Sequence, residues 1–169
     1  PWLIFGGILL GQTGIYCWYS FIDPQLTLVS GFSRDAMSWL MVIAGAGMFI
    51  GNLTAGYLAD RFKPAGVATC VQISAIPILL LFYFFADIKI CAVVLMMLGT
   101  ATLFGSGSPL QSSIVSYSRG GEMLGAACIQ IAYNAGNAIA AWLGGEVIRE
   151  TGDYLSPSIV GLPLIVVGS

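Results

Sequence analysis

The stretch GYLADRFKP at residues 56–64 decides how this chain can fold, because it gathers Asp60, Arg61 and Lys63 in a sequence where charge is rare. Charged residues make up 8% of the 169 residues, whereas a soluble domain carries about 25%. A charged side chain at the centre of a bilayer would cost about 2.5–3.5 kcal/mol. We therefore expect this triplet at a membrane surface, in a tight turn between two spanning helices.

On both sides of this turn, the sequence divides into long stretches without Asp, Glu, Lys or Arg: 1–22, 36–59, 64–86, 90–118 and 123–145. Each has at least the roughly 20 residues that a helix needs to cross a 30 Å hydrocarbon core. A sixth apolar stretch, 154–169, is shorter. The mean hydropathy of +0.90 agrees with lipid as the solvent. We predict an all-α, polytopic membrane helix bundle with spans at about 1–22, 37–59, 65–86, 90–112, 123–147 and 157–169, the last one truncated.

Several other classes of protein are disfavoured by composition. The net charge is −2 without a basic tract, which argues against nucleic acid as a partner. The chain has no His, and its four Cys residues show no CxxC spacing, so we expect no metal site, no cofactor and no catalytic residue. The cysteines are read as apolar buried thiols, with a metal or disulfide role as the alternative. Because the sequence opens on Pro inside an apolar stretch, we expect an internal piece of a longer protein.

Small residues recur at helix-packing spacing within the predicted spans. Gly47 and Gly51 lie four residues apart in the second span, and Gly136, Ala140 and Gly144 do so in the fifth. Small residues on one face allow helices to approach closely where no hydrophobic effect drives them together. This pattern supports a helix bundle but does not indicate its function.

The turn also carries a resemblance to a known family. Gly56, Leu58, Asp60 and Arg61 match the G-x-L-x-D-R core of the loop motif of the major facilitator superfamily, although that motif continues with Gly and basic residues and this chain continues with FKPA. The stretches WYSFIDPQLTLVSGFS (18–33) and AYNAGNAIAAWLGGEVI (132–148) resemble arabinose-efflux-permease-like members of its drug:proton antiporter branch.

The resemblance implies a C-terminal half of a transporter, helices seven to twelve, in a bacterial inner membrane. It further implies efflux of sugars or small drug-like molecules by alternating access with proton antiport. The partners would be the lipid bilayer, the N-terminal six-helix half, a small-molecule cargo and protons. Asp60 and Arg61 would lie at the cytoplasmic face and bridge to the other half when the inner gate closes.

In this superfamily the first and fourth helices of each half line the cavity, so the resemblance directs attention to polar residues in those spans. The fifth span adds a polar stripe at i, i+4 and i+7. The candidate cargo-binding residues are Gln12, Thr13, Tyr16, Thr100, Ser106, Gln130, Asn134 and Asn137. The alternative for each is an interhelical hydrogen bond worth about 1 kcal/mol.

Two other functions remain open. An intramembrane enzyme would need a nucleophile–base pair or metal ligands, and the sequence has neither HExxH nor GxSxG. A receptor or scaffold built on the same fold would leave the same sequence pattern. No Asp, Glu, Lys, Arg or His lies inside a span, so a titrating carboxylate for proton coupling is expected in the other half.

Overall fold

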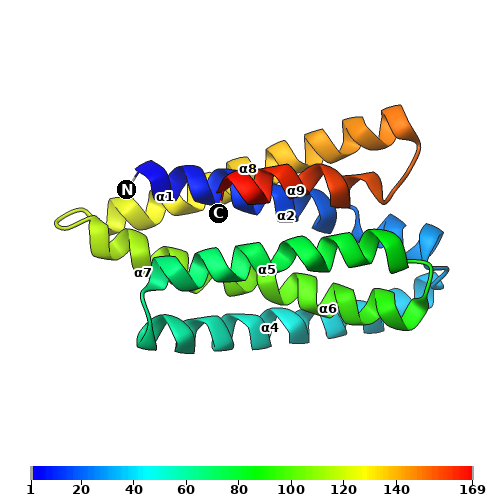
Figure 1. Ribbon diagram of the computed structural model, residues 1–169, viewed down its shortest axis with the longest axis horizontal. Coiled ribbons are helices and arrows are strands. Elements are labelled where there is room, and N and C mark those ends of the chain that lie inside the picture. The colour runs from blue at the N-terminus through cyan, green and yellow to red at the C-terminus, as the bar shows by residue number, and fades with distance from the viewer. Residues whose placement is uncertain (1, 169) are drawn as a thin grey trace.

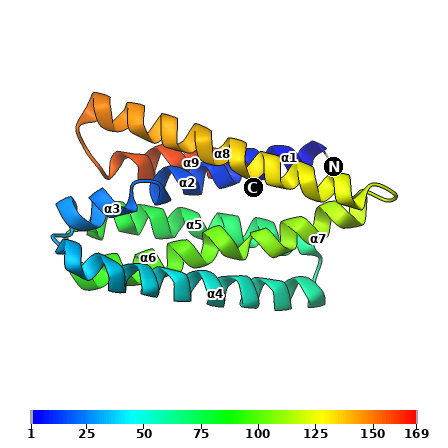
Figure 2. The same ribbon diagram turned by 180° about the vertical axis from the view of Figure 1, so that it is seen from behind.

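A computed structural model describes residues 2–168 as a bundle of helices, without a strand in that range. The helices run side by side along one axis in two groups (Figures 1 and 2). One group holds α1, α2, α8 and α9, and the other holds α4, α5, α6 and α7. The prediction of an all-α membrane bundle is confirmed.

The first predicted span forms three consecutive helical pieces. These are α1 (Trp2–Gly7), the π-helical turn η1 (Ile8–Gln12) and α2 (Thr13–Tyr19). Glycine is a poor helix former, and Gly7 and Gly11 lie within or beside the π turn. A Cβ on Gly7 would fall 2.9 Å from the carbonyl oxygen of Gly168 in α9. Close approach of a second backbone therefore requires small residues here.

The segment between α2 and α4 is mostly helical. It consists of α3 (Ile22–Pro24), the π turn η2 (Gln25–Val29) and the 3₁₀ turn η3 (Arg34–Ala36). Two buried polar side chains fix it to other turns. Gln25 Nε2 donates to the carbonyl oxygen of Tyr154 at 2.8 Å, and Ser30 Oγ donates to that of Ala86 at 2.6 Å.

Four helices follow: α4 (Met37–Arg61), α5 (Pro64–Phe85), α6 (Lys89–Gly105) and α7 (Gly107–Tyr117). By length and composition, Arg34–Arg61, Pro64–Phe85 and Lys89–Tyr117 could each cross a membrane. The α4–α5 turn is short because Phe62 is extended and Pro64 begins α5, where its missing N–H is not needed.

The last two helices are α8 (Glu122–Thr151) and α9 (Ser156–Gly168). At its start, Glu122 accepts a hydrogen bond from the Gly120 N–H at 3.0 Å, and bonds from its own N–H and that of Gly120 lower the pKa of its carboxyl. The polar residues after 145 do not end α8. It continues to Thr151 and ends at Gly152, whose φ of +70° favours glycine.

The core is centred on Trp18, which is fully buried. Its ring meets that of Phe82 edge to face, with centroids 5.4 Å apart. A Cβ on Gly99 would fall 2.5 Å from the Trp18 ring, so this glycine provides the room for the indole. The tryptophan therefore joins α2, α5 and α6, which are distant in the sequence.

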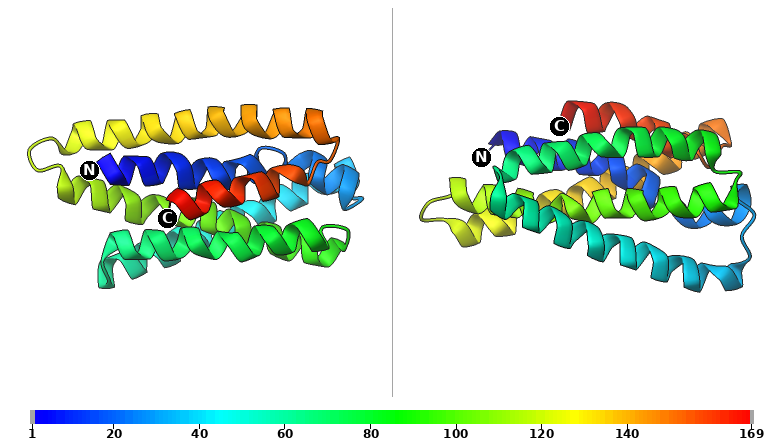
Figure 3. Two further views of the ribbon diagram at one scale, coloured as in Figure 1. Left: turned by 45° about the horizontal axis from the view of Figure 1, so that its top comes forward. Right: turned by 60° about the horizontal axis from the view of Figure 1, so that its bottom comes forward.

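The helix contacts follow a paired pattern. The first segment, which consists of α1, η1 and α2, packs on α8 and on α9. In the same way, α6 packs on α4 and on α5. Figure 3 shows these neighbours from two further sides. Each half of the chain thus contributes three helical segments in equivalent positions, an arrangement common among membrane transporters with internal repeats.

Candidate functional site

A polar cavity of about 210 Å³ lies between α2, the junction of α6 with α7, and α8. Four of the predicted cargo-binding residues line it: Tyr16, Gln130, Asn134 and Asn137. The remaining lining residues are Leu103, Phe104, Gly107 and Tyr133. Apolar walls with a few converging polar groups are the usual composition of a small-molecule site.

The three amides from α8 reach this cavity because their spacing places them on one helix face. All three side chains are exposed. Asn134 Nδ2 donates to the carbonyl oxygen of Gln130 at 2.9 Å. Among residues 2–168, the side chains of Gln130 and Asn137 have no hydrogen-bond partner. Their donors and acceptors are therefore available to a bound molecule.

Tyr133 is the polar lining residue that sequence reasoning missed. Its hydroxyl is buried and has no hydrogen-bond partner within the described residues. A buried hydroxyl without a partner is costly, so one that borders a cavity is a natural contact for a ligand or a water. A signal was present in the sequence, because Tyr133 lies three residues after Gln130 on the same helix face.

Gln12 and Ser106 lie inside the bundle instead of on the cavity wall. Both side chains are fully buried, and Gln12 Nε2 donates a hydrogen bond to Ser106 Oγ. Ser106 Oγ in turn donates to the carbonyl oxygen of Leu103 at 3.2 Å. Gln12 Oε1 is buried without a partner among residues 2–168. This pair connects the π turn of the first segment to the break between α6 and α7.

Thr13 and Thr100 are also buried away from the cavity. Thr13 Oγ1 donates to the carbonyl oxygen of Leu9 in its own helix. Thr100 Oγ1 lies 3.0 Å from the Met96 carbonyl oxygen and 3.3 Å from that of Ala44 in α4. The structure thus places the predicted cargo-binding residues in two groups, four on the cavity and four in helix contacts.

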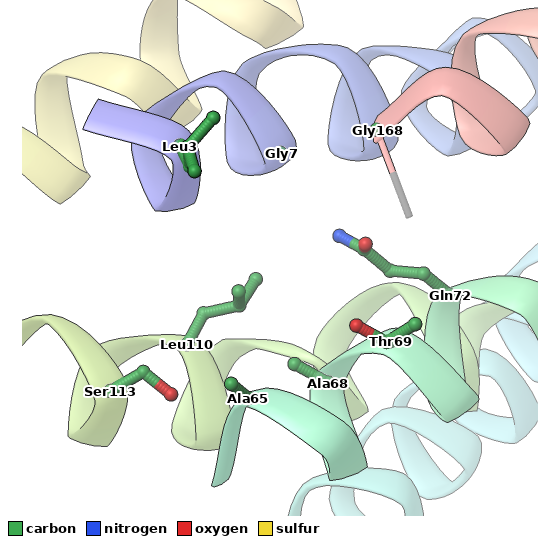
Figure 4. Close-up of a pocket in the computed structure, with 9 residues that line it drawn as sticks. All are labelled: Leu3, Gly7, Ala65, Ala68, Thr69, Gln72, Leu110, Ser113 and Gly168. Carbon is green, nitrogen blue, oxygen red and sulfur yellow. The ribbon is translucent and has the colours of Figure 1, made fainter. Parts of the chain in front are cut away.

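A second cavity, of about 160 Å³, lies between α1, α5, α7 and α9 (Figure 4). Gln72 points from α5 across it toward the first segment. This side chain is 2% exposed, and its Nε2 has no hydrogen-bond partner in the described part of the chain. Thr69 and Ser113 add hydroxyls, but Ser113 Oγ already donates to the Pro109 carbonyl oxygen at 2.8 Å.

The residues of the loop motif lie at the end of α4. Asp60 and Arg61 are exposed in its last turn, and the Arg61 guanidinium lies 4.6 Å from the centroid of the Tyr57 ring. Gly56 faces Ser108 of α7, where an added Cβ would make an ordinary 3.5 Å contact. Leu58 lines a groove between α4 and α5. Within residues 2–168 the Asp60 carboxylate has no ion-pair partner.

The small residues predicted for helix packing lie at close contacts between helices. A Cβ on Gly47 would fall 2.5 Å from the Met97 carbonyl oxygen, and one on Gly51 would fall 2.6 Å from Ala101 Cα. On α8, a Cβ on Gly136 would fall 2.9 Å from Thr13 Oγ1. Gly144 faces the Phe21 ring, and Ala140 is fully buried.

No group of three His, Cys, Asp or Glu side chains in the described range could hold a metal ion. The residues that line the first cavity, all within residues 2–168, carry no charged side chain. The chemistry available at the cavity is therefore neutral hydrogen bonding and contact with aromatic rings. Such a surface can bind and release a molecule.

Known proteins resemble this chain along most of its length. It is 35% identical over 148 residues to AraJ of Escherichia coli (strain K12), a protein assigned as a transporter, covering 88% of this chain and 38% of AraJ. It is 34% identical over 146 residues to the uncharacterized MFS-type transporter YfhI of Bacillus subtilis (strain 168), covering 86% of this chain and 36% of YfhI. It is 28% identical over 164 residues to the inner membrane transport protein YdhP of Escherichia coli O157:H7, covering 94% and 42%.

The chain spans less than half the length of these relatives. No family model matches it, and no solved structure does. The apolar helices and the named relatives agree with an integral membrane protein. The chain belongs to the major facilitator superfamily.

Proposed function

We propose that the chain is the C-terminal six-helix half of a secondary active transporter that exports sugars or small drug-like molecules. Cargo would pass by alternating access, with proton antiport as the driving reaction. The N-terminal half would supply the other wall of the cargo site and the titrating carboxylate. The proposal is supported by the relatives, which carry the names of transporters.

One observation carries this proposal: Tyr16 of α2 and the amide stripe of α8 converge on a single cavity at the break between α6 and α7. Interrupted helices beside a midplane site are typical of secondary transporters. The break has a local cause, because Gly105, Gly107 and Pro109 weaken the helix around Ser106. The unbound amides of Gln130 and Asn137 would provide the contacts to cargo.

The lining favours a neutral cargo. An ionic molecule in a low-dielectric site needs an opposite charge, and the eight lining residues include none. Hydroxyl and amide groups pair well with a sugar or with the polar groups of an amphipathic drug. The aromatic rings of Tyr16, Phe104 and Tyr133 would cover its apolar faces.

The test is transport by the full-length protein in everted membrane vesicles, with a panel of labelled sugars and neutral drugs. Asn137→Ala is expected to raise KM about fivefold, the effect of losing one hydrogen bond of roughly 1 kcal/mol. Asn52→Ala, which changes an exposed Asn on α4 away from the cavity, is the matched control. Collapse of the proton gradient is expected to stop uptake.

Absence of uptake across the panel, by a protein that is correctly inserted, would favour the scaffold interpretation instead. Uptake that survives collapse of the proton gradient would reject antiport and keep the transporter. Equal KM values for Asn137→Ala and Asn52→Ala would reject this cavity as the cargo site.

A further inference from the structure

The α4–α5 turn borders an apolar groove of about 440 Å³ that has no part in the proposed transport cycle. Its walls are Leu58 and Phe62 from the α4 side and Gly66, Val67 and Cys70 from α5, and Lys63 adds the one charged side chain among its lining residues. The apolar lining is nearly continuous, so the groove resembles a site for a hydrocarbon chain with one cation at its end. Phe62 is 64% exposed, which a water-facing surface would disfavour.

Among residues 2–168, Lys63 has no ion-pair partner. The ion pair shown in the described range, Arg149–Glu146, is at the other end of the bundle. The neighbouring Arg61 stacks on Tyr57, and Asp60 makes no ion pair with Lys63. Lys63 immediately precedes α5, whose N-terminus has no side-chain cap, so the helix dipole adds to the positive field around Lys63.

The two ends of the bundle also differ in charge, and the end that carries Lys63 is the more positive. The α4–α5 turn and the α7–α8 loop lie at one end, and the α5–α6 turn, the α8–α9 loop and the segment before α4 lie at the other (Figures 1 and 2). The first end carries Arg61, Lys63, Arg119, Asp60 and Glu122. The second carries three basic and six acidic side chains. An anionic headgroup is therefore favoured at the Lys63 end.

We propose that this groove binds an anionic phospholipid of the membrane, with an acyl chain against Leu58, Phe62 and Val67 and the phosphate at Lys63. The chemistry is complementary at both ends of such a molecule, and the α4–α5 turn, expected at a membrane surface, would place Lys63 at the depth of the headgroups. Basic pockets between spanning helices are known to hold anionic headgroups. The site is separate from the cargo cavity, so the proposed lipid binding can be tested independently of transport.

Two variants separate the charge from the groove. Lys63→Gln removes the cation and leaves the apolar walls intact. Gly66→Phe places an aromatic ring at the groove wall and leaves Lys63 intact, and the Cβ that it adds meets nothing within 4 Å. Lys89→Gln, at the start of α6 at the opposite end, is the matched control for charge. Gly66→Ala is the matched control for the groove.

The experiment is native mass spectrometry of the full-length protein with phosphatidylglycerol or phosphatidylcholine added to its micelles. We expect wild type to retain phosphatidylglycerol in preference to phosphatidylcholine. Lys63→Gln should weaken this retention about fivefold, the factor for one lysine at an anionic lipid surface, and Gly66→Phe should abolish it. Both controls should behave as wild type. Unchanged retention in Lys63→Gln, or an equal loss in Lys89→Gln, would overturn the proposal.

Discussion

The side-chain amide of Gln12 donates a hydrogen bond to the hydroxyl of Ser106, 94 positions away in the sequence. Gln12 closes the π turn of the first segment, and Ser106 lies between α6 and α7. The contact therefore joins the irregular points of two helical segments. Because both side chains are fully buried, no water can replace the bond if it breaks.

Removing this contact should destabilise the protein, and substitutions of its two partners should show a measurable coupling energy. In a double-mutant cycle of Gln12→Ala and Ser106→Ala, we expect coupling of about 0.6 kcal/mol, the average for hydrogen bonds between membrane helices, and at most about 1.7 kcal/mol. Denaturant unfolding of the full-length protein in micelles measures it. Thr102→Ala replaces Ser106→Ala in the control cycle, because the Thr102 hydroxyl bonds Gly99 within its own helix. Additive effects in both cycles would contradict the prediction.

Two glycines of α4 should respond in opposite ways to an added methyl group. Gly51→Ala drives a Cβ into the backbone of Ala101 and should destabilise the protein by about 1–3 kcal/mol. Gly45→Ala, on the same helix, meets nothing within 4 Å and should stabilise it by up to about 1 kcal/mol through helix propensity. Unfolding of the two variants under identical conditions gives the comparison. Equal stabilities would show that α4 and α6 do not approach this closely.

Tyr133→Phe should separate stability from cargo binding. The buried Tyr133 hydroxyl has no partner among residues 2–168, so its removal should leave the unfolding free energy unchanged or raise it by about 1 kcal/mol. If the hydroxyl contacts cargo, as proposed, KM for transport should rise several-fold in the same variant. A loss of stability with an unchanged KM would reverse the assignment and make Tyr133 a packing residue.

Asp60→Asn should reduce transport without lowering stability. Asp60 lies in the last turn of α4, where the helix dipole disfavours a carboxylate, and it has no ion-pair partner in the described range. Its charge therefore offers little to the described part of the chain, and the gate contact that the resemblance implies would explain its presence. Transport rate and melting temperature of the full-length protein are the two readouts. Asp87→Asn, in the turn before α6, is the control; equal transport in both variants would leave Asp60 without a gating role.

The sequence by itself determined the solvent and the fold class. Long stretches without charge predict membrane helices because charge burial in hydrocarbon is costly at every position, irrespective of neighbours. The structure has helices at the predicted places, with α4 at Met37–Arg61 and α5 at Pro64–Phe85. Boundaries were less predictable. The charged residues after 145 continue α8 because a helix can extend past the apolar layer with its polar groups exposed.

The tertiary structure alone decided which polar side chains share a site. Gln12 and Tyr16 lie four residues apart and were both predicted to bind cargo. The structure buries Gln12 against Ser106, whereas Tyr16 lines the cavity with Asn137. The pattern in one helix fixes its polar face, but the rotation of that face depends on its neighbours. Here the close approach of Gly14 to the Gly161 backbone of α9, and the π turn before Thr13, constrain that rotation. Such contacts join residues far apart in the chain, and no local pattern encodes them.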